Sequence, residues 1–186
     1  MSDETAANAE QTGPVVVLVG PPGAGKTTVG RRLAERLGVG FLDTDAAVEE
    51  RAGKPVAEIF VVDGEPAFRR LEHEAVATAL AEHDGVLSLG GGAVLDPATR
   101  DLLRAHRVVF LDVDLGAAAQ RVGLDTPRPL LIGNPRATLR QQLADRRPHY
   151  LEVATAVVAT SALSPAEVVE AVLDVVRGER TEDEAG

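Results

Sequence analysis

The chain has 186 residues, of which 45% are hydrophobic and 26% charged, ordinary values for one globular domain with a substantial core. A formal net charge of −10 argues against a general nucleic-acid binder, and the absence of cysteine excludes disulfides and zinc-thiolate sites. No apolar run reaches transmembrane length, and residues 1–13 lack the basic start and apolar stretch of a secretory signal. We therefore expect a cytoplasmic domain at 14–177, without nucleic-acid or membrane partners, between disordered tails at 1–13 and 178–186. We also expect the chain to be a monomer.

Apolar runs alternate with helical patterns along the chain. We expect strands at 15–19, 40–43, 86–89, 108–111 and 156–159, and helices at 28–37, at 63–82 and after the capping sequence Ser164-Pro165-Ala166-Glu167. Continuously apolar strands separated by helices predict an α/β fold with a parallel sheet covered on both faces. In such sheets ligands bind beyond the carboxyl ends of the strands.

The segment GPPGAGKT at residues 20–27 matches the P-loop pattern without a mismatch and lies between a predicted strand and a predicted helix. Its glycines let backbone N–H groups point at phosphate oxygens, and the helix N-terminus adds partial positive charge. Lys26 is placed to reach the β- and γ-phosphates, and the Thr27 hydroxyl to bind Mg²⁺. The alternative is a glycine-rich turn without a ligand. The residues expected to bind a nucleoside triphosphate are Gly23, Ala24, Gly25, Lys26, Thr27 and Thr28.

The second predicted strand ends in Asp43-Thr44-Asp45. Two carboxylates two residues apart in an extended segment point to the same side. One of them can hold Mg²⁺ through water, and the other can accept a proton from an acceptor hydroxyl. The alternative is a helix that begins near Ala46, with Thr44 or Asp45 as its N-cap.

The third predicted strand runs into Ser88-Leu89-Gly90-Gly91-Gly92. The glycines permit close approach of backbone to a ligand, or they form a loose turn. The Ser88 hydroxyl can reach the coordination shell of a magnesium ion, or Ser88 is a core serine whose hydroxyl is hydrogen-bonded within the protein. On the next helix upstream, Arg69 and Glu72 share one face at i, i+3, as a carboxylate clamp or a surface ion pair.

Two further arginines follow the fourth strand. Arg128 is bracketed by prolines, which is typical of a lid that presents a cation to the moving phosphoryl group, or of a plain surface loop. Arg146 precedes Arg147-Pro148-His149-Tyr150 and is either a second anion clamp or part of a solvated helix face.

Taken together, these motifs resemble the shikimate kinase family, from about residue 15 to 177. The P-loop is followed by the family's D-[ST]-D at 43–45, F-R-x-x-E at 68–72, triple glycine at 90–92, lid R-P-L at 128–130 and R-x-x-x-Y at 146–150. The P-loop is common to many NTPases, whereas the later motifs in this order are much more specific. Between residues 161 and 165 the chain lacks the basic residue that family members often carry there.

The resemblance implies a three-layer P-loop kinase with a five-stranded parallel sheet in the order 2-3-1-4-5 and a lid loop. It implies phosphorylation of the shikimate 3-hydroxyl by ATP with one Mg²⁺, an acceptor-binding region near 44–72 and a lid near 122–135. Glu72 would hold Arg69. The resemblance assigns catalysis to Lys26, Asp45 and Arg128, shikimate binding to Asp45, Arg69, Gly90, Gly91, Gly92 and Arg146, metal binding to Thr27 and Asp43, and ATP contacts to Arg121, Arg128 and Pro165.

The charges of the candidate residues independently favour an anionic, hydroxylated acceptor. Two arginines are suited to bind an anion, and a carboxylate at the reacting end is suited to accept a proton from a hydroxyl. Gluconate would also satisfy this requirement, so a gluconate or nucleoside monophosphate kinase of the same fold is the nearest alternative. A nucleotide-dependent switch without an acceptor is the alternative from another class, and it has no use for the acceptor-site arginines.

Overall fold

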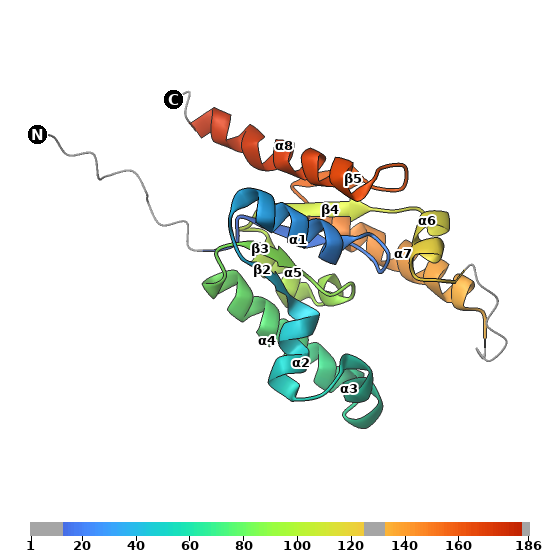
Figure 1. Ribbon diagram of the computed structural model, residues 1–186. Coiled ribbons are helices and arrows are strands. Elements are labelled where there is room, and N and C mark those ends of the chain that lie inside the picture. The colour runs from blue at the N-terminus through green and yellow to red at the C-terminus, as the bar shows by residue number, and fades with distance from the viewer. Residues whose placement is uncertain (1–12, 125–132, 184–186) are drawn as a thin grey trace, which may run out of the picture.

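Five parallel strands form one sheet in the order β2-β3-β1-β4-β5, as the family resemblance implied (Figure 1). The computed structural model describes residues 13–124 and 133–183. The strands are β1 (Val16–Val19), β2 (Phe41–Asp43), β3 (Val86–Ser88), β4 (Val108–Asp112) and β5 (Ala156–Ala159). The order of the strands reverses at the central strand β1, so its carboxyl end opens into the crevice where ligands bind in such sheets.

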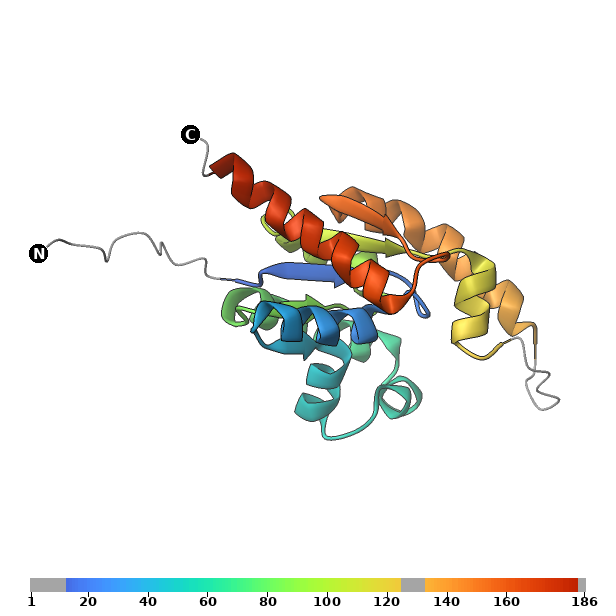
Figure 2. The same ribbon diagram turned by 45° about the horizontal axis from the view of Figure 1, so that its top comes forward.

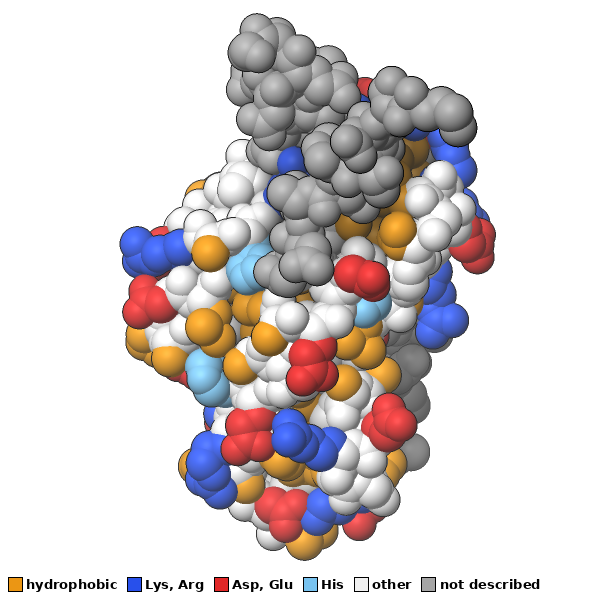
Figure 3. Space-filling view, turned by 90° about the vertical axis from the view of Figure 1, so that its left-hand side faces the viewer, with side chains coloured by type: hydrophobic (Ala, Val, Ile, Leu, Met, Phe, Trp, Pro, Cys, Tyr) orange, Lys and Arg blue, Asp and Glu red, His pale blue; other side chains and the backbone are white. Residues whose placement is uncertain are grey.

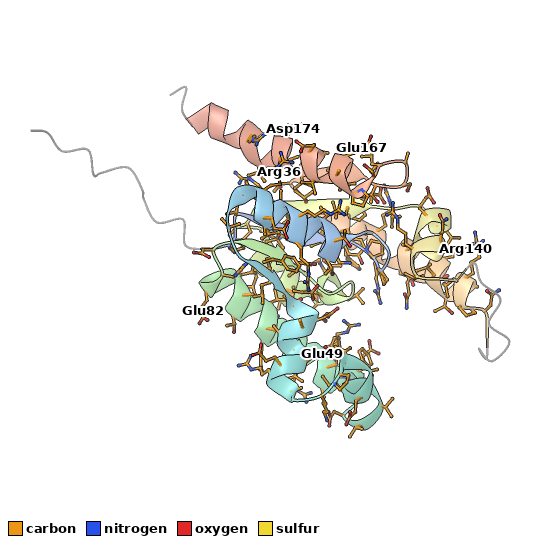
Figure 4. All side chains as sticks on the ribbon, in the orientation of Figure 1. Arg36, Glu49, Glu82, Arg140, Glu167 and Asp174 are labelled. Atoms are coloured by element: carbon orange, nitrogen blue, oxygen red, sulfur yellow. The ribbon has the colours of Figure 1, made fainter. Side chains whose placement is uncertain are left out.

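Helices cover both faces of the sheet (Figure 2). On one face lie α1 (Lys26–Leu37) and α8 (Pro165–Asp183), where Arg36 of α1 pairs with Glu170 of α8 at 2.5 Å (Arg36 is labelled in Figure 4). On the other face lie α4 (Glu65–Glu82), the short turn η1 (Ala93–Leu95), α5 (Pro97–Leu103) and α7 (Pro135–Val153). Beyond the strand ends lie α2 (Thr44–Ala52), α3 (Val56–Val62) and α6 (Leu115–Arg121).

The central strand β1 connects the two cores because its side chains alternate between faces. Val16 and Leu18 pack with the apolar stripe of α8, whereas Val17 and Val19 pack with α4, α5 and α7. All four residues are at most 1% exposed. This double burial explains why the strand is a continuous apolar run rather than an alternating one.

A third, smaller core holds the segment that follows β2. Val48 of α2, Ile59 of α3 and Phe68 of α4 pack together there, away from the sheet. The Phe60 ring contacts the Phe68 ring with their centroids 4.5 Å apart. The predicted acceptor-binding region is therefore a subassembly of three helices with its own apolar support.

Two element boundaries differ from the sequence prediction. The helix expected over 63–82 begins at Glu65, because Gly64 adopts a positive φ of 85° and separates it from α3. Helix α8 continues to Asp183, so the tail predicted to begin at residue 178 is helical over its first part. The predicted capping box is confirmed: the Ser164 N–H donates to Glu167 Oε2 at 2.7 Å, and the Glu167 N–H to Ser164 Oγ at 3.3 Å.

No helix within the described residues is long and apolar enough to span a bilayer. Figure 3 shows the end of the molecule at which the strands begin, where acidic and basic side chains are interspersed among hydrophobic ones.

Close approach of two backbones at the start of β2 and β3 leads to a stability prediction. A Cβ on Gly85 would lie 2.1 Å from the carbonyl oxygen of Gly40, whereas a Cβ on Gly178 of α8 would meet no atom within 4 Å. We expect Gly85→Ala to lower the free energy of unfolding by about 1–3 kcal/mol through overpacking. Gly178→Ala should raise it by about 0.5–1 kcal/mol because alanine favours the helix. Urea denaturation of both variants measures this, and equal effects would contradict it.

Candidate active site

The P-loop curls between β1 and α1 through glycines in conformations that other residues avoid. Gly23 and Gly25 have φ values of 82° and 89°, and Gly25 is the residue from which α1 begins. A Cβ on Gly23 would lie 2.9 Å from the carbonyl oxygen of Ala118 in α6. The first N–H groups of α1 lack intrahelical partners, which makes this loop a site for phosphate.

Lys26 is the first residue of α1, and its ammonium group folds back over the loop. Its Nζ donates to the carbonyl oxygens of Gly20 at 2.7 Å and Pro21 at 3.0 Å. Burial lowers the pKa of Lys26 to about 8, against the opposing attraction of Asp45 and Asp43. A polyphosphate in the loop would restore the charged form, so this lysine is suited to hold an anion.

A pocket of about 500 Å³ continues from the P-loop toward the start of α8. Arg121 and Pro165, the two predicted adenine contacts, both line this pocket. The Arg121 guanidinium donates to the Gly23 carbonyl at 3.1 Å and to the Thr160 carbonyl at 2.9 Å. Leu163 also lines the pocket, and sequence reasoning did not single out Thr160 or Leu163. The stretch 161–165, which lacks a basic residue, therefore presents the apolar side chain of Leu163 to the pocket.

Asp43 ends β2 and is bonded at both carboxylate oxygens. Its Oδ1 accepts the Asp45 N–H at 2.9 Å, and its Oδ2 accepts the Thr27 hydroxyl at 3.1 Å. The alternative reading, a helix that begins near Ala46 with Thr44 or Asp45 as its N-cap, is therefore wrong: α2 begins at Thr44 and its cap is Asp43. The premise that Asp45 lies in an extended segment is also wrong, since it sits in the first turn of α2. The turn still brings both carboxylates near Lys26, and their negative charges partly offset the lowering of the Lys26 pKa by burial.

The Ser88 hydroxyl lies on the sheet face that carries Asp43, because Ser88 pairs in register with Asp43 of β2 and Leu18 of β1. Ser88 is completely buried, and its Oγ finds no hydrogen-bond partner among the described residues. The expected alternative of a satisfied core serine is therefore not what the structure shows. A buried hydroxyl without a partner beside the Thr27–Asp43 pair fits the water shell of a metal ion.

The triple glycine has the Asp45 and Glu72 side chains on one side and the P-loop on the other. A Cβ on Gly90 would lie 2.4 Å from Asp45 Oδ1 and 2.9 Å from Glu72 Oε1. A Cβ on Gly91 would lie 3.2 Å from Cδ of Pro22 in the P-loop. Burial, and then the charge of Asp43, raises the pKa of Asp45, whereas Lys26 lowers it. Asp45 is therefore a partly buried carboxylate beside the nucleotide loop, with increased affinity for a proton.

Arg69 is held in place by a buried acid. Its Nη1 donates to Glu72 Oε2 at 2.6 Å, and the Glu72 side chain is only 4% exposed. Burial raises the pKa of Glu72, while the hydrogen bond and charge of Arg69 oppose the rise. A Cβ on Gly92 would lie 2.3 Å from Arg69 Nη1, so the guanidinium lies directly on the backbone there. The alternative of a plain surface ion pair does not describe this contact.

Arg146 and Arg147 point to different places, although they are neighbours on α7. Arg147 pairs with Asp112 Oδ2 at 2.9 Å at the end of β4. Arg146 Nη1 would lie 3.4 Å from a Cβ on Gly91, and the charge of Arg146 acts on Lys26. Of the two, Arg146 therefore faces the triple glycine and the phosphate loop.

The structure thus brings most of the predicted side chains together at the carboxyl ends of β1, β2 and β3. Arg128 and most of the predicted lid lie outside the described residues. No cluster of three or more acidic or histidine side chains in the described residues can hold a metal by itself. A phosphate loop, a carboxylate and two guanidinium groups suit phosphoryl transfer to a hydroxyl on an anionic acceptor.

Comparison with known proteins is consistent with this chemistry. The model of the shikimate kinase family matches residues 22–177. A shikimate kinase of Thermobifida fusca is 62% identical over 157 residues, 84% of this chain and 91% of that protein. One of Saccharopolyspora erythraea is 60% identical over 168 residues, 90% of this chain and 96% of that protein.

Solved structures show the same relationship. A shikimate kinase from Acinetobacter baumannii in complex with shikimate superposes with a TM-score of 0.83 at 37% identity, covering 91% of this chain and 96% of that one. A gluconokinase from Sinorhizobium meliloti has a TM-score of 0.59 at 24% identity, covering 95% and 100%, and shares the fold alone. The chain therefore belongs to the shikimate kinase family.

Proposed function

We propose that this chain transfers the γ-phosphoryl group of ATP to the 3-hydroxyl of shikimate, with Asp45 at the acceptor oxygen and Arg69 and Arg146 on the carboxylate. The single observation that carries the assignment of roles is the triple glycine. It lies against Asp45 at one end and Arg69 at the other, with the P-loop beside its middle residue. A hydroxylated acid lying along this segment would meet a carboxylate and two cations at once.

The nucleotide half of the site follows from the pocket between the P-loop and α8. The triphosphate lies on the N–H groups of the loop, and Lys26 leaves the Gly20 and Pro21 carbonyls for phosphate oxygens. Thr27 and Asp43 would hold Mg²⁺, directly and through water, with Ser88 as a further partner for that water. Bound there, the ion neutralises charge on the phosphates. Arg128 is proposed to add a cation from the lid.

At the acceptor, Asp45 accepts a hydrogen bond from the reacting hydroxyl and so points its lone pair at the γ-phosphate. In phosphoryl transfer this orientation and the surrounding positive charge supply most of the rate enhancement. Glu72 fixes the Arg69 guanidinium, whose remaining N–H groups match a carboxylate. The acceptor is thus gripped at its carboxylate and free to react at the opposite end.

The first test compares acceptors. Purified protein with MgATP is given shikimate, gluconate, AMP, CMP or no acceptor, and ADP release is followed. We expect strong stimulation by shikimate alone. Stimulation by gluconate or a nucleotide would retain the nucleotide site and overturn the acceptor, while equal slow release in every sample would favour a nucleotide switch.

A second prediction concerns Asp45. Asp45→Asn should abolish turnover and leave ATP affinity nearly unchanged. It should also raise Tm at pH 7: a raised pKa in the folded state means that folding favours the neutral form, so removing the charge stabilises the fold. In the wild type, kcat/KM should fall as pH drops through this raised pKa. Calorimetry, ATP titration and a pH–rate profile measure these effects, and a parallel loss of ATP affinity would place Asp45 in the nucleotide site instead.

A third prediction concerns the contact between Arg69 and Gly92. A methyl group on Gly92 would displace the Arg69 guanidinium, because the available space is 2.3 Å. We expect Gly92→Ala, like Arg69→Ala, to raise the KM for shikimate by roughly tenfold or more, the equivalent of a lost charge-assisted hydrogen bond. The KM for ATP should change little. Gly178→Ala is the matched control, and an unchanged shikimate KM in Arg69→Ala would return Arg69 to a surface role.

A further inference from the structure

Two buried hydroxyl groups from distant parts of the chain hold consecutive residues of the triple glycine. The Gly90 N–H donates to Thr44 Oγ1 at 3.0 Å, and the Tyr150 hydroxyl donates to the Gly91 carbonyl at 2.5 Å. Thr44 is 0% exposed and Tyr150 is 1% exposed. One contact comes from the first residue of α2 and the other from the end of α7, so they approach the glycines from different layers.

We propose that Thr44 and Tyr150 are positioning residues for the acceptor: their hydroxyl groups brace the Gly90–Gly91 dipeptide, and this brace sets where Asp45, Arg69 and Arg146 meet the substrate. The inference rests on the proposed function. It explains why a hydroxyl residue stands between Asp43 and Asp45, since any residue could occupy that place if only the carboxylates mattered. It also gives a role to the tyrosine four residues after Arg146.

A brace is needed because glycine backbone has no side chain to hold it. Residues with no Cβ sample a wide range of φ and ψ, and a run of three would be the least ordered part of the site. The following turn η1 also holds this segment, since the Ala93 N–H donates to the Gly90 carbonyl at 3.1 Å and the Leu95 N–H donates to the Gly92 carbonyl at 3.0 Å. The two hydroxyl groups instead satisfy a donor and an acceptor that face neighbouring elements.

Tyr150 is coupled to Arg146 as well as to the glycine. Burial raises the pKa of Tyr150 to about 12, against the opposing charge and hydrogen bond of Arg146. The phenol is therefore neutral at physiological pH and able to donate to Gly91. Its ring stacks on Phe110 of β4 with centroids 4.9 Å apart, which fixes the hydroxyl at one height above the sheet. Arg146, the Tyr150 hydroxyl and Gly91 thus form one connected unit.

The test uses variants of the full chain that delete each hydroxyl while keeping its shape. We expect Tyr150→Phe and Thr44→Val each to raise the KM for shikimate by roughly five- to thirtyfold, the cost of leaving a buried partner unsatisfied. The KM for ATP should stay within about twofold, a bound smaller than one such lost partner would produce. Thr44→Ser keeps the hydroxyl and should restore the shikimate KM.

The control removes a bridging hydroxyl far from the site. Thr155 Oγ1 donates to the Val108 carbonyl at 2.9 Å and accepts the Val108 N–H at 3.1 Å, near the amino ends of β4 and β5. Thr155→Val should lower Tm without changing either KM. If Tyr150→Phe behaves like Thr155→Val, or raises both KM values equally, the hydroxyl is merely structural and the proposal fails.

A double-mutant cycle tests the coupling to Arg146. In an Arg146→Ala background, Tyr150→Phe should change the shikimate KM by less than about twofold, because coupled residues are not additive. Fully additive effects would overturn the connection. Should Thr44→Val fail to fold, Tyr150→Phe and the cycle decide the question. A wild-type protein without shikimate-dependent turnover would refute the proposed function rather than the brace.

Discussion

Close approach to a backbone without side chains is the constraint on which this site depends. Three groups from different helices contact three consecutive glycines: Asp45 at Gly90, Arg146 at Gly91 and Arg69 at Gly92. A single methyl group at Gly90 or Gly92 would occupy space already filled by Asp45 or Arg69, the side chains proposed to bind the acceptor. The glycines therefore do not serve as a flexible hinge. Because they lack side chains, they leave room for one carboxylate and two guanidinium groups to approach the same stretch of backbone from three helices.

The triple glycine lies between the nucleotide half and the acceptor half of the proposed site. It follows β3, the strand between the edge strand that carries Asp43 and the central strand that leads into the P-loop. Because parallel strands end at the same edge of the sheet, nucleotide and acceptor groups meet without a domain interface. Burial then alters their charges in opposite ways, lowering the pKa of Lys26 and raising that of Asp45. Both shifts favour the neutral form of the group, and an anionic phosphate beside Lys26 would oppose the first of them.

The proposed acceptor region has its own apolar support, separate from the two cores of the sheet. Val48 of α2, Ile59 of α3 and Phe68 of α4 pack together in a small cluster. Arg69 therefore stands on a helix held from two sides, by this cluster and by the sheet. This support matters because a guanidinium can select a carboxylate only if its own orientation is fixed.

Many features of the fold and the site could be predicted from the sequence because the signals for them are local. The P-loop, the apolar strands and the capping box at Ser164 depend on neighbours in the chain, and the fold matched the order that the family motifs implied. The burial of Glu72 and the partners of Thr44 and Tyr150 were decided only by the tertiary structure. Each depends on an atom many residues away: Thr44 and Gly90 are 46 positions apart, and Gly91 and Tyr150 are 59 apart. Spacing along a chain carries no record of such contacts, because the packing of separate layers creates them.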